Sequence, residues 1–249
     1  MLSFGAWLGK WAAELCWPSR CVSCGIFAGA HLCDGCLRTG TGHKGPRCRI
    51  CDDACVAPVC RRCCLHSPHC LRRARGVYRY EGAIKRAILA GKNNGHEAVW
   101  PIFARLIGAD PEAWALGQKA DVLVPIPLAP HRRMSRGYNP SALLAQALGK
   151  LWHKPVGYLL RHNGAQARTP LSRLGAAARQ RAATGAFGPA RPNAVVPGLR
   201  LLLVDDVITT GATLREAAQT LMLMGAQGVT AVALARQTLE HGKRVPTRL

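Results

Sequence analysis

The chain has 249 residues, 49% of them hydrophobic, and carries a formal net charge of +21 at pH 7. That length and apolar content allow a packed core, built as one large domain or as a medium domain with a small one. No run reaches the ~18 apolar residues of a membrane span, and Lys10 interrupts the apolar N-terminus where a signal peptide would be continuous. We therefore expect a cytoplasmic protein without a membrane span.

The positive charge comes mainly from arginine, which gathers at residues 61–75 and 132–136. A basic surface of this size favours polyanions, either phosphorylated small molecules or nucleic acid. A solvated, arginine-rich surface explains the same composition, so the charge alone does not choose between these interpretations.

The composition divides the chain into four parts. Residues 1–18 are predicted to form an amphipathic helix that docks on the body of the protein, with membrane or partner contact as the alternative. Residues 19–72 are predicted to be a Cys-rich double zinc ribbon, residues 76–240 an α/β domain and residues 241–249 a basic tail.

All twelve cysteines lie within the first 70 residues, and eight of them form a repeated pattern. Two CxxC pairs separated by eight residues occur twice, first at Cys21, Cys24, Cys33 and Cys36 and then at Cys48, Cys51, Cys60 and Cys63. Cysteine pairs with this spacing are typical of zinc sites, so we predict one or two structural Zn²⁺ ions on these eight residues. Four protein ligands leave no open position for a reacting water, so we expect no catalysis there.

Several alternatives remain open for the cysteines. Disulfide bonds compete with zinc, although they need an oxidising compartment, which the missing signal peptide argues against. The spacing is compatible with one ion in each repeat and with ligands that cross between repeats. Cys64 could replace its neighbour Cys63 as a ligand, and His66 and His69 are weaker candidates.

From about Gly76 the pattern changes to alternating strands and helices. Strands are predicted at 77–80, 121–126, 199–207 and 229–235, and helices at 83–89 and 214–224. Such alternation predicts a mostly parallel sheet whose ligand lies beyond the carboxyl ends of the strands.

A segment rich in proline and arginine follows the strand at 121–126. The prolines predict a stiff loop, the arginines supply forked donors for phosphate, and a glycine permits a sharp turn. Asn139 as N-cap and Pro140 in the first turn then predict a helix through Leu148. A solvated loop is the alternative to an anion site. The candidate binding residues are Arg132, Arg133, Arg136 and Gly137.

Residues 161–185 contain many Arg, Ala, Gly and Gln residues and little β-pattern. An excursion of that length fits a mobile lid over a pocket, and an exposed helix is the alternative.

The most informative segment is LLLVDDVITTGAT, residues 201–213. An aliphatic strand runs into Asp205 and Asp206, and a Thr/Gly-rich turn then precedes the predicted helix. The loop amides and the helix N-terminus attract an anion, while the two carboxylates, both expected to be ionised, accept from ribose hydroxyls or hold the water shell of Mg²⁺. The predicted phosphate-binding residues are Thr209, Thr210, Gly211, Ala212 and Thr213.

This segment resembles the phosphoribosyl-pyrophosphate (PRPP) signature of type I phosphoribosyltransferases. Nearly the whole chain resembles the ComF family, which implies a double zinc ribbon joined to a type I phosphoribosyltransferase-like domain at 76–240, a bacterial cytoplasmic location and a link to DNA uptake and competence. The other resembling pieces are the CxxC repeats, Tyr78-x-Tyr80-x-Gly82 with Lys92, residues 125–139, and Arg179 with Gly185–Phe187.

The chain departs from the family pattern at two places. Pro140 stands where the family usually has Gln, and Leu171 or Ser172 and Ala182 fall near the usual Gln and Asn before Gly185. If those amides help to recognise an acceptor, the departures concern the acceptor and the activity, and they leave the PRPP signature unaltered.

The leading hypothesis is a phosphoribosyltransferase that binds Mg²⁺-PRPP and releases pyrophosphate. The 5′-phosphate would lie on residues 209–213, the ribose on Asp205 and Asp206, and the pyrophosphate near Arg132 and Arg136. No residue identifies the acceptor. A second hypothesis is a non-catalytic PRPP sensor or a protein that binds single-stranded DNA or the DNA-uptake machinery, and a third is a scaffold with a vestigial pocket.

Overall fold

The computed structural model describes residues 19–65, 70–164, 185–192 and 194–238. The predicted N-terminal helix, the basic tail, most of the predicted lid, and His66, His69, Arg179, Leu171, Ser172 and Ala182 lie outside these residues. The elements are α2 (Asp34–Arg38), α3 (Arg61–Leu65), β1 (Leu71–Arg79), α4 (Gly82–Asn93), α5 (Val99–Ala109), α6 (Pro111–Lys119), β2 (Val122–Pro125), α7 (Pro130–Arg136), α8 (Pro140–Trp152), β3 (Leu160–His162), β4 (Phe187–Pro189), β5 (Arg200–Ile208), α10 (Ala212–Leu223) and β6 (Gly228–Arg236).

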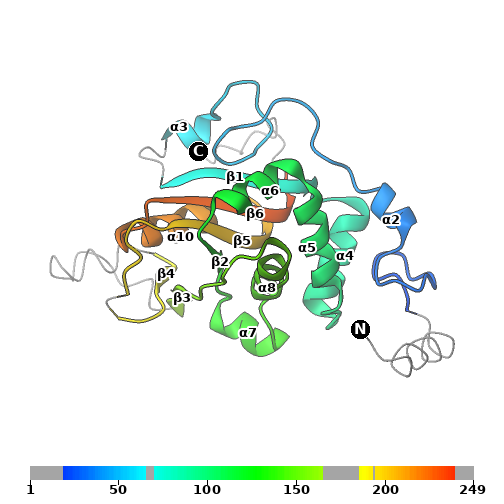
Figure 1. Cartoon of the computed structure of the whole chain (residues 1–249). Helices are drawn as coiled ribbons and strands as arrows, with labels where there is room; N and C mark the ends of the chain where they lie inside the picture. The colour runs from blue at the N-terminus through cyan, green and yellow to red at the C-terminus, as the bar shows by residue number, and fades with distance from the viewer. Residues whose placement is uncertain (1–18, 66–69, 165–184, 193, 239–249) are drawn as a thin grey trace, which may run out of the picture.

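Four parallel strands form the central sheet in the order β1-β6-β5-β2 (Figure 1). This arrangement confirms the predicted α/β class with a parallel sheet. Parallel neighbours need crossover connections, and helices α4 to α8 and α10 lie within those connections. Because all four strands end at one edge of the sheet, the segments that follow them meet there.

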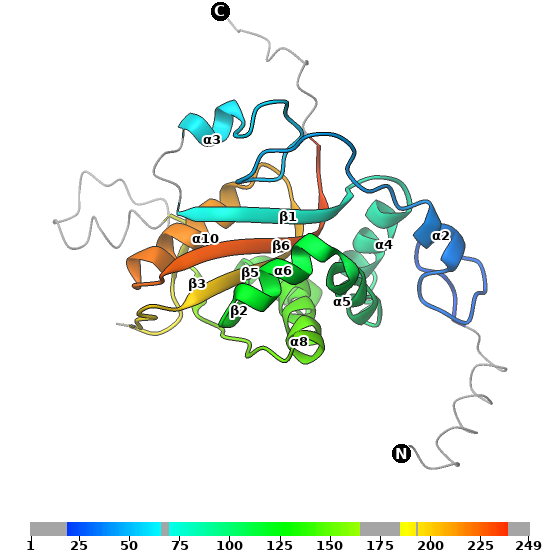
Figure 2. The same cartoon turned by 45° about the horizontal axis from the view of Figure 1, so that its top comes forward.

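Helices cover both faces of the sheet, with α5 and α8 on one face and α10 on the other (Figures 1 and 2). The unbroken aliphatic sequence of β5 fits this burial on two sides. Leu202 and Val204 belong to the apolar cluster beneath α5 and α8, whereas Leu201 and Leu203 belong to the cluster beneath α10.

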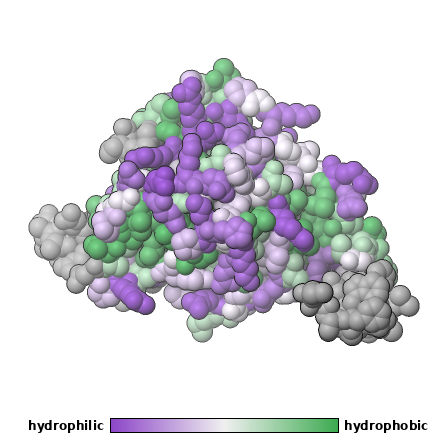
Figure 3. Space-filling model, in the orientation of Figure 1, coloured by the Kyte–Doolittle hydropathy of each residue, from purple (hydrophilic) through white to green (hydrophobic). Residues whose placement is uncertain are grey.

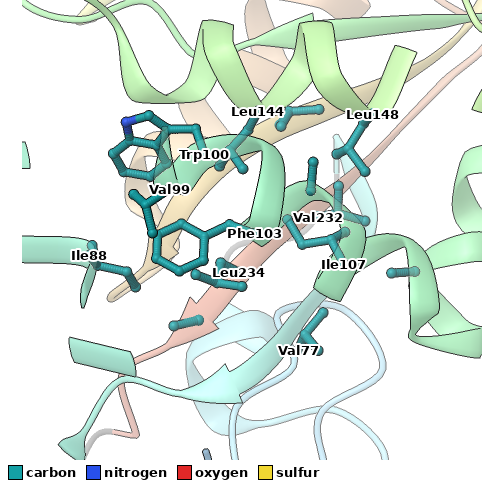
Figure 4. Close-up of a cluster of buried hydrophobic side chains, with 14 of the residues drawn as sticks. Val77, Ile88, Val99, Trp100, Phe103, Ile107, Leu144, Leu148, Val232 and Leu234 are labelled. Carbon is teal, nitrogen blue, oxygen red and sulfur yellow. The ribbon is translucent and has the colours of Figure 1, made fainter. Parts of the chain in front are cut away.

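Trp100 and Phe103 of α5 lie at the centre of the first of these clusters. Their rings meet edge to face with centroids 5.4 Å apart, and both side chains are fully buried. Figure 4 shows them between Leu144 of α8 and Leu234 of β6. Large aromatic side chains contribute much buried area, so packing of these two rings against Leu144 and Leu234 holds α5 against α8 and the sheet. Within the described residues, none of the helices combines the length and the apolar character that a membrane crossing requires.

The first strand begins earlier than the sequence predicted. β1 starts at Leu71. Its first half contains three arginines, which interrupt the apolar pattern of a strand in the sequence but bind partners from other parts of the chain. Arg75, which is buried, donates from Nε and Nη2 to the two carboxylate oxygens of Asp110 at 3.0 and 2.7 Å. Pairing between β1 and β6 then extends along the whole strand.

Two further boundaries differ from the prediction. The segment expected to be a proline-stiffened loop contains the short helix α7, which starts at Pro130 and ends at Arg136. Gly137 follows it with a φ of +79°. Asp205 and Asp206 lie inside β5 rather than at its end, because the strand continues to Ile208. Gly225, which follows the last turn of α10, has a φ of +95°, the left-handed conformation that commonly ends a helix.

A glycine in β1 lets the strand lie close to β6. A Cβ at Gly76 would lie 2.7 Å from Cβ of Arg236 and 3.1 Å from its backbone nitrogen. We expect Gly76→Ala to lower the free energy of unfolding by about 1–3 kcal/mol, because strand backbone must move. Urea denaturation measures this. Gly42→Ala, where a Cβ meets nothing within 4 Å, is the control and should change little; equal effects of the two substitutions would contradict this account of the close approach.

Candidate functional site

Each cysteine repeat forms its own cluster of four thiols. All sulfur atoms of a cluster lie within 4.8 Å of one another, and every cysteine in the described residues is a free thiol. The alternatives of ligands crossing between repeats and of Cys64 replacing Cys63 are therefore wrong. The clusters are Cys21, Cys24, Cys33 and Cys36, and Cys48, Cys51, Cys60 and Cys63.

The two clusters are built by the same turn. The residue after the first CxxC pair, Gly25 in one repeat and Asp52 in the other, has a positive φ of 78° and 61° respectively. Backbone N–H groups then point at sulfur: Cys33 N lies 3.4 Å from Sγ of Cys21, and Cys60 N lies 3.3 Å from Sγ of Cys48. Donors directed at sulfur stabilise a thiolate, which is the form that binds metal.

The donor set of each cluster fits structural zinc. Burial raises the pKa of Cys21 and Cys48, but backbone hydrogen bonds outweigh it and lower the values to about 6 and about 7. Burial raises the pKa of Cys36 and Cys51 to about 12. Four thiols this close do not all lose their protons unless a divalent cation compensates the charge. When bound, zinc would cross-link the loops of each repeat through these sulfur atoms.

The second cluster is docked on the sheet by buried ion pairs. Asp53 and Arg236, both with fully buried side chains, lie with Oδ2 and Nη2 3.4 Å apart. Asp52 accepts from Gly76 N at 2.8 Å and from Arg47 Nη1 at 3.1 Å. Buried charges of opposite sign hold their partners in place, because separating them would leave an uncompensated charge.

A pocket of about 480 Å³ lies at the carboxyl edge of the sheet. Asp205 and Asp206 of β5 line it, together with Thr209 and Thr213. Arg132 and Arg136 of α7 line it as well. The acidic pair and two of the three predicted arginines thus line the same pocket.

Both carboxylates in the pocket have partners from distant parts of the chain. Lys92, at the end of α4, donates from Nζ to Oδ1 of Asp206 at 2.6 Å. Ser141, at the start of α8, donates from Oγ to Oδ1 of Asp205 at 3.0 Å. The acidic pair is therefore held by α4 on one side and α8 on the other.

Burial opposes the expectation that both carboxylates remain ionised, and it does so at Asp205. Burial raises the pKa of this group to about 7, the neighbouring charge of Asp206 adds to the effect, and Lys92 opposes it. Two carboxylates so close in a buried setting favour one bound proton. Burial of this residue depends on the surrounding helices, which the local sequence does not show.

Two helices begin at the pocket and present positive ends to it. The predicted N-cap of α8 is confirmed, because Oδ1 of Asn139 accepts from Ser141 N at 3.1 Å and Pro140 is the first helical residue. α10 begins after Gly211, whose φ of +74° turns the chain into the helix. Helix N-termini attract anions, so both ends suit phosphate groups.

Some of the predicted binding residues are next to the pocket but not in its wall. Gly211 and Gly137 shape turns with positive φ, and Arg133 lies on the exposed surface of α7. Figure 3 shows hydrophilic residues spread over much of the face seen in Figure 1. Of the described residues predicted for this site, those outside the wall are Thr210, Gly211, Ala212, Arg133 and Gly137.

The pocket also contains residues that the sequence did not single out. Glu216 lies one helical turn after Thr213 on α10, so the helical period could have indicated it. His131 and His162 carry no such signal, since α7 and the β3–β4 pair bring them to the pocket. Burial lowers the pKa of His162, and the nearby His131 and Arg132 add to this.

These features define an α/β protein with a polar pocket at the carboxyl edge of a parallel sheet and two Cys₄ clusters. The chain is 30% identical over 212 residues to competence protein ComFC of Bacillus subtilis, which covers 83% of each chain. It therefore belongs to the ComF family.

Two other relatives match about half of the chain. The DNA utilization protein YhgH of Salmonella typhimurium is 37% identical over 48% of this chain and 51% of its own. Competence protein F of Haemophilus influenzae is 33% identical over 47% of this chain and 50% of its own. No family model matches the chain.

Among solved structures, a purine phosphoribosyltransferase of Pyrococcus horikoshii is similar over 55% of this chain and 73% of its own, with 20% identity and a TM-score of 0.32. The glutamine PRPP amidotransferase of Bacillus subtilis is similar over 55% of this chain and 26% of its own, with 22% identity and a TM-score of 0.38. Similarity this distant assigns no activity.

The two clusters predict two zinc ions per chain. Cys36→Ser and Cys63→Ser should each reduce the zinc content of the purified protein by one ion, because each removes one ligand from one cluster. Elemental analysis of the protein measures the content. Cys64→Ser is the matched control for Cys63→Ser, since Cys64 is exposed and outside the cluster. Loss of an ion from the Cys64 variant, or no loss from the Cys63 variant, would disprove this ligand set.

The raised pKa of Asp205 predicts a pH-dependent effect on stability. Because the pKa of Asp205 is about 7 in the folded protein against the usual 3.8, its proton contributes stability that is fully present below about pH 3.8 and is lost progressively as the pH rises through 7. Asp205→Asn, which stays neutral, should therefore gain about 1–3 kcal/mol relative to the native protein between pH 5 and pH 8. Urea denaturation at both values measures the difference.

Asp121→Asn provides the control for this pH series. Hydrogen bonds from Arg200 lower the pKa of Asp121 to about 2, so its charge does not change between pH 5 and pH 8. Its effect on stability should be the same at both values. A pH-independent effect of Asp205→Asn would show that this carboxyl is already ionised at pH 5.

Proposed function

We propose that the pocket binds Mg²⁺-PRPP and that the protein is a phosphoribosyltransferase-type enzyme. The observation that carries the proposal is that Asp205, Asp206, Thr209 and Thr213 of the signature line one pocket together with Arg132 and Arg136 of α7. One wall offers carboxylates for hydroxyl groups and a helix end for a phosphate, and the other offers guanidinium groups for a second phosphate.

The 5′-phosphate would bind at the loop 209–213. The amides at the N-terminus of α10 are unpaired within the helix and favour an anion. Thr213 lines the pocket one residue into the first turn of that helix, so its hydroxyl is available as a further donor. Gly211, with its positive φ, carries no side chain that would cover these amides.

The ribose hydroxyls would bind at the acidic pair. Carboxylate oxygens accept from vicinal hydroxyls, and Asp205 and Asp206 are adjacent in the pocket wall. Lys92 now occupies Oδ1 of Asp206 and would exchange this partner for the ligand. Bound Mg²⁺ would supply positive charge to the pyrophosphate oxygens, with the acidic pair as the groups that suit its water shell.

The pyrophosphate would lie toward α7 and α8. Arg132 and Arg136 line that side of the pocket, and α8 begins beside them at Pro140. Guanidinium groups and a helix N-terminus both stabilise negative charge, which grows on the pyrophosphate as its bond to C1′ breaks.

The chemistry assigned to the chain is positioning and charge stabilisation. Breaking the bond between C1′ and pyrophosphate leaves an oxocarbenium-like centre, and an acceptor nucleophile then bonds to C1′. Arg132 and Arg136 would stabilise the leaving group, while the loop and the acidic pair would hold the sugar. None of these steps needs a dedicated base on the protein if the acceptor is already nucleophilic.

A second candidate function is binding without turnover, as a PRPP sensor that handles single-stranded DNA or contacts the DNA-uptake machinery. The net charge of +21 and the similarity to a competence protein and a DNA utilization protein favour it. Basic surfaces bind nucleic acid through phosphates, so such binding should weaken steeply with salt. Release of pyrophosphate from bound PRPP separates the two candidates.

Calorimetric titration of Mg²⁺-PRPP into the zinc-loaded protein tests the pocket. We expect binding by the native protein and a loss of at least about 100-fold in the variant Asp205→Asn/Asp206→Asn, which corresponds to about 2.7 kcal/mol. Asp121→Asn, an acidic residue outside the pocket, is the control and should bind as the native protein does. No heat from the folded native protein would reject both the enzyme and the sensor.

A further inference from the structure

The second cysteine cluster is directly connected to the loop 209–213. Arg62 precedes Cys63 in α3, and its Nη1 donates to the backbone oxygen of Thr210 at 3.0 Å. Its Nη2 lies 3.5 Å from Oδ2 of Asp53, within the same cysteine repeat. One side chain thus joins the cluster Cys48–Cys63 to the turn that precedes α10.

Asp53, which pairs with Arg62, also connects the second cysteine repeat to the sheet. Its carboxylate also pairs with Arg236 at 3.4 Å, and both side chains are fully buried. Arg236 ends β6 and is aligned with Ile208, the last residue of β5 before the loop. Its Nη2 lies 3.9 Å from Sγ of Cys51, a member of the cluster. The cluster is therefore connected to the residue before the loop through Arg236 and to the loop itself through Arg62.

The backbone oxygen that Arg62 holds determines the direction of a neighbouring amide. Thr210 O and Gly211 N–H belong to one planar peptide unit and point in opposite directions. Arg215 Nη1 also donates to Thr210 O at 3.2 Å, so two guanidinium groups hold this peptide. The orientation of Gly211 N–H, one of the loop amides assigned above to the 5′-phosphate, depends on them.

We infer that the second zinc cluster positions the phosphate loop through Arg62, so that zinc occupancy of this cluster and PRPP binding are coupled. Arg62 is a positioning residue, since it acts through the peptide 210–211. Coupling between two sites is reciprocal, so PRPP must also strengthen zinc retention at this cluster. The inference rests on the proposed binding of PRPP at residues 209–213.

The first cluster lacks a comparable connection to the loop among the described residues. Its cysteines Cys21, Cys33 and Cys36 pack with Val77 and the helices α4 and α5, and Arg86 of α4 donates to Ser23 O at 3.0 Å. Figures 1 and 2 both show α2 beside α4 and away from α3. Zinc at the first cluster should therefore stabilise the fold without responding to PRPP.

The test combines PRPP affinity with zinc release. In calorimetry with Mg²⁺-PRPP on zinc-saturated protein, Arg62→Ala should lose affinity by about tenfold, within the usual range of coupling between sites. Arg62→Lys should also lose affinity, because one ammonium does not replace a planar fork that contacts both Thr210 and Asp53. Arg61→Ala, the exposed neighbour in α3, is the matched control and should bind within about twofold of the native protein.

Zinc release to a coloured chelator gives the second measurement, with and without Mg²⁺-PRPP. In the native protein PRPP should slow the release of one of two ions, and this slowing should disappear in Arg62→Ala and Arg62→Lys and persist in Arg61→Ala. Native affinity in both Arg62 variants, or release that PRPP does not change in the native protein, overturns the coupling alone. Absence of PRPP binding by the native protein overturns the proposed function and the coupling together.

Discussion

The buried charge of Arg236 is the constraint on which the packing of the second cysteine repeat against the parallel sheet depends. A fully buried guanidinium requires a partner of opposite charge, and Asp53 of the second cysteine repeat provides it. Arg236 ends β6, which lies between β1 and β5. The pair therefore fixes the second cysteine repeat against the middle of the sheet. The close approach of Gly76 makes room for the same side chain. The second cysteine repeat is therefore packed against the sheet as part of the same folded unit.

The parallel sheet has a comparable effect on the pocket. Because strands β5 and β2 end at the same edge, the carboxylates near the end of β5 and the guanidinium groups of α7, which follows β2, line one pocket. The acidic pair therefore lies in the pocket to which we assign the ribose hydroxyls. Lys92 and Ser141 hold that pair, so the pocket is organised by the fold of the chain itself.

Local patterns predicted the four strands of the sheet, the helices α4, α8 and α10 and the two clusters, and tertiary contacts account for part of what they missed. The parallel sheet, the N-cap Asn139 and the two Cys₄ groups follow from periodicity and spacing, which depend on neighbouring residues only. The full length of β1 was missed because its arginines find distant partners such as Asp110. Two contacts of the site join residues far apart in the sequence, so no local pattern predicts them: the pair Lys92–Asp206 and the hydrogen bond from Arg62 to Thr210.

The central claim, that the pocket formed by β5, α7 and α10 binds PRPP, is tested most directly by a crystal structure of the zinc-loaded protein with Mg²⁺ and PRPP. The account predicts the 5′-phosphate on the amides of residues 209–213, the ribose hydroxyls on Asp205 and Asp206, and the pyrophosphate beside Arg132 and Arg136, with Lys92 released from Asp206. PRPP bound elsewhere on the protein, or bound in the reverse orientation with its pyrophosphate on the 209–213 loop, would contradict it.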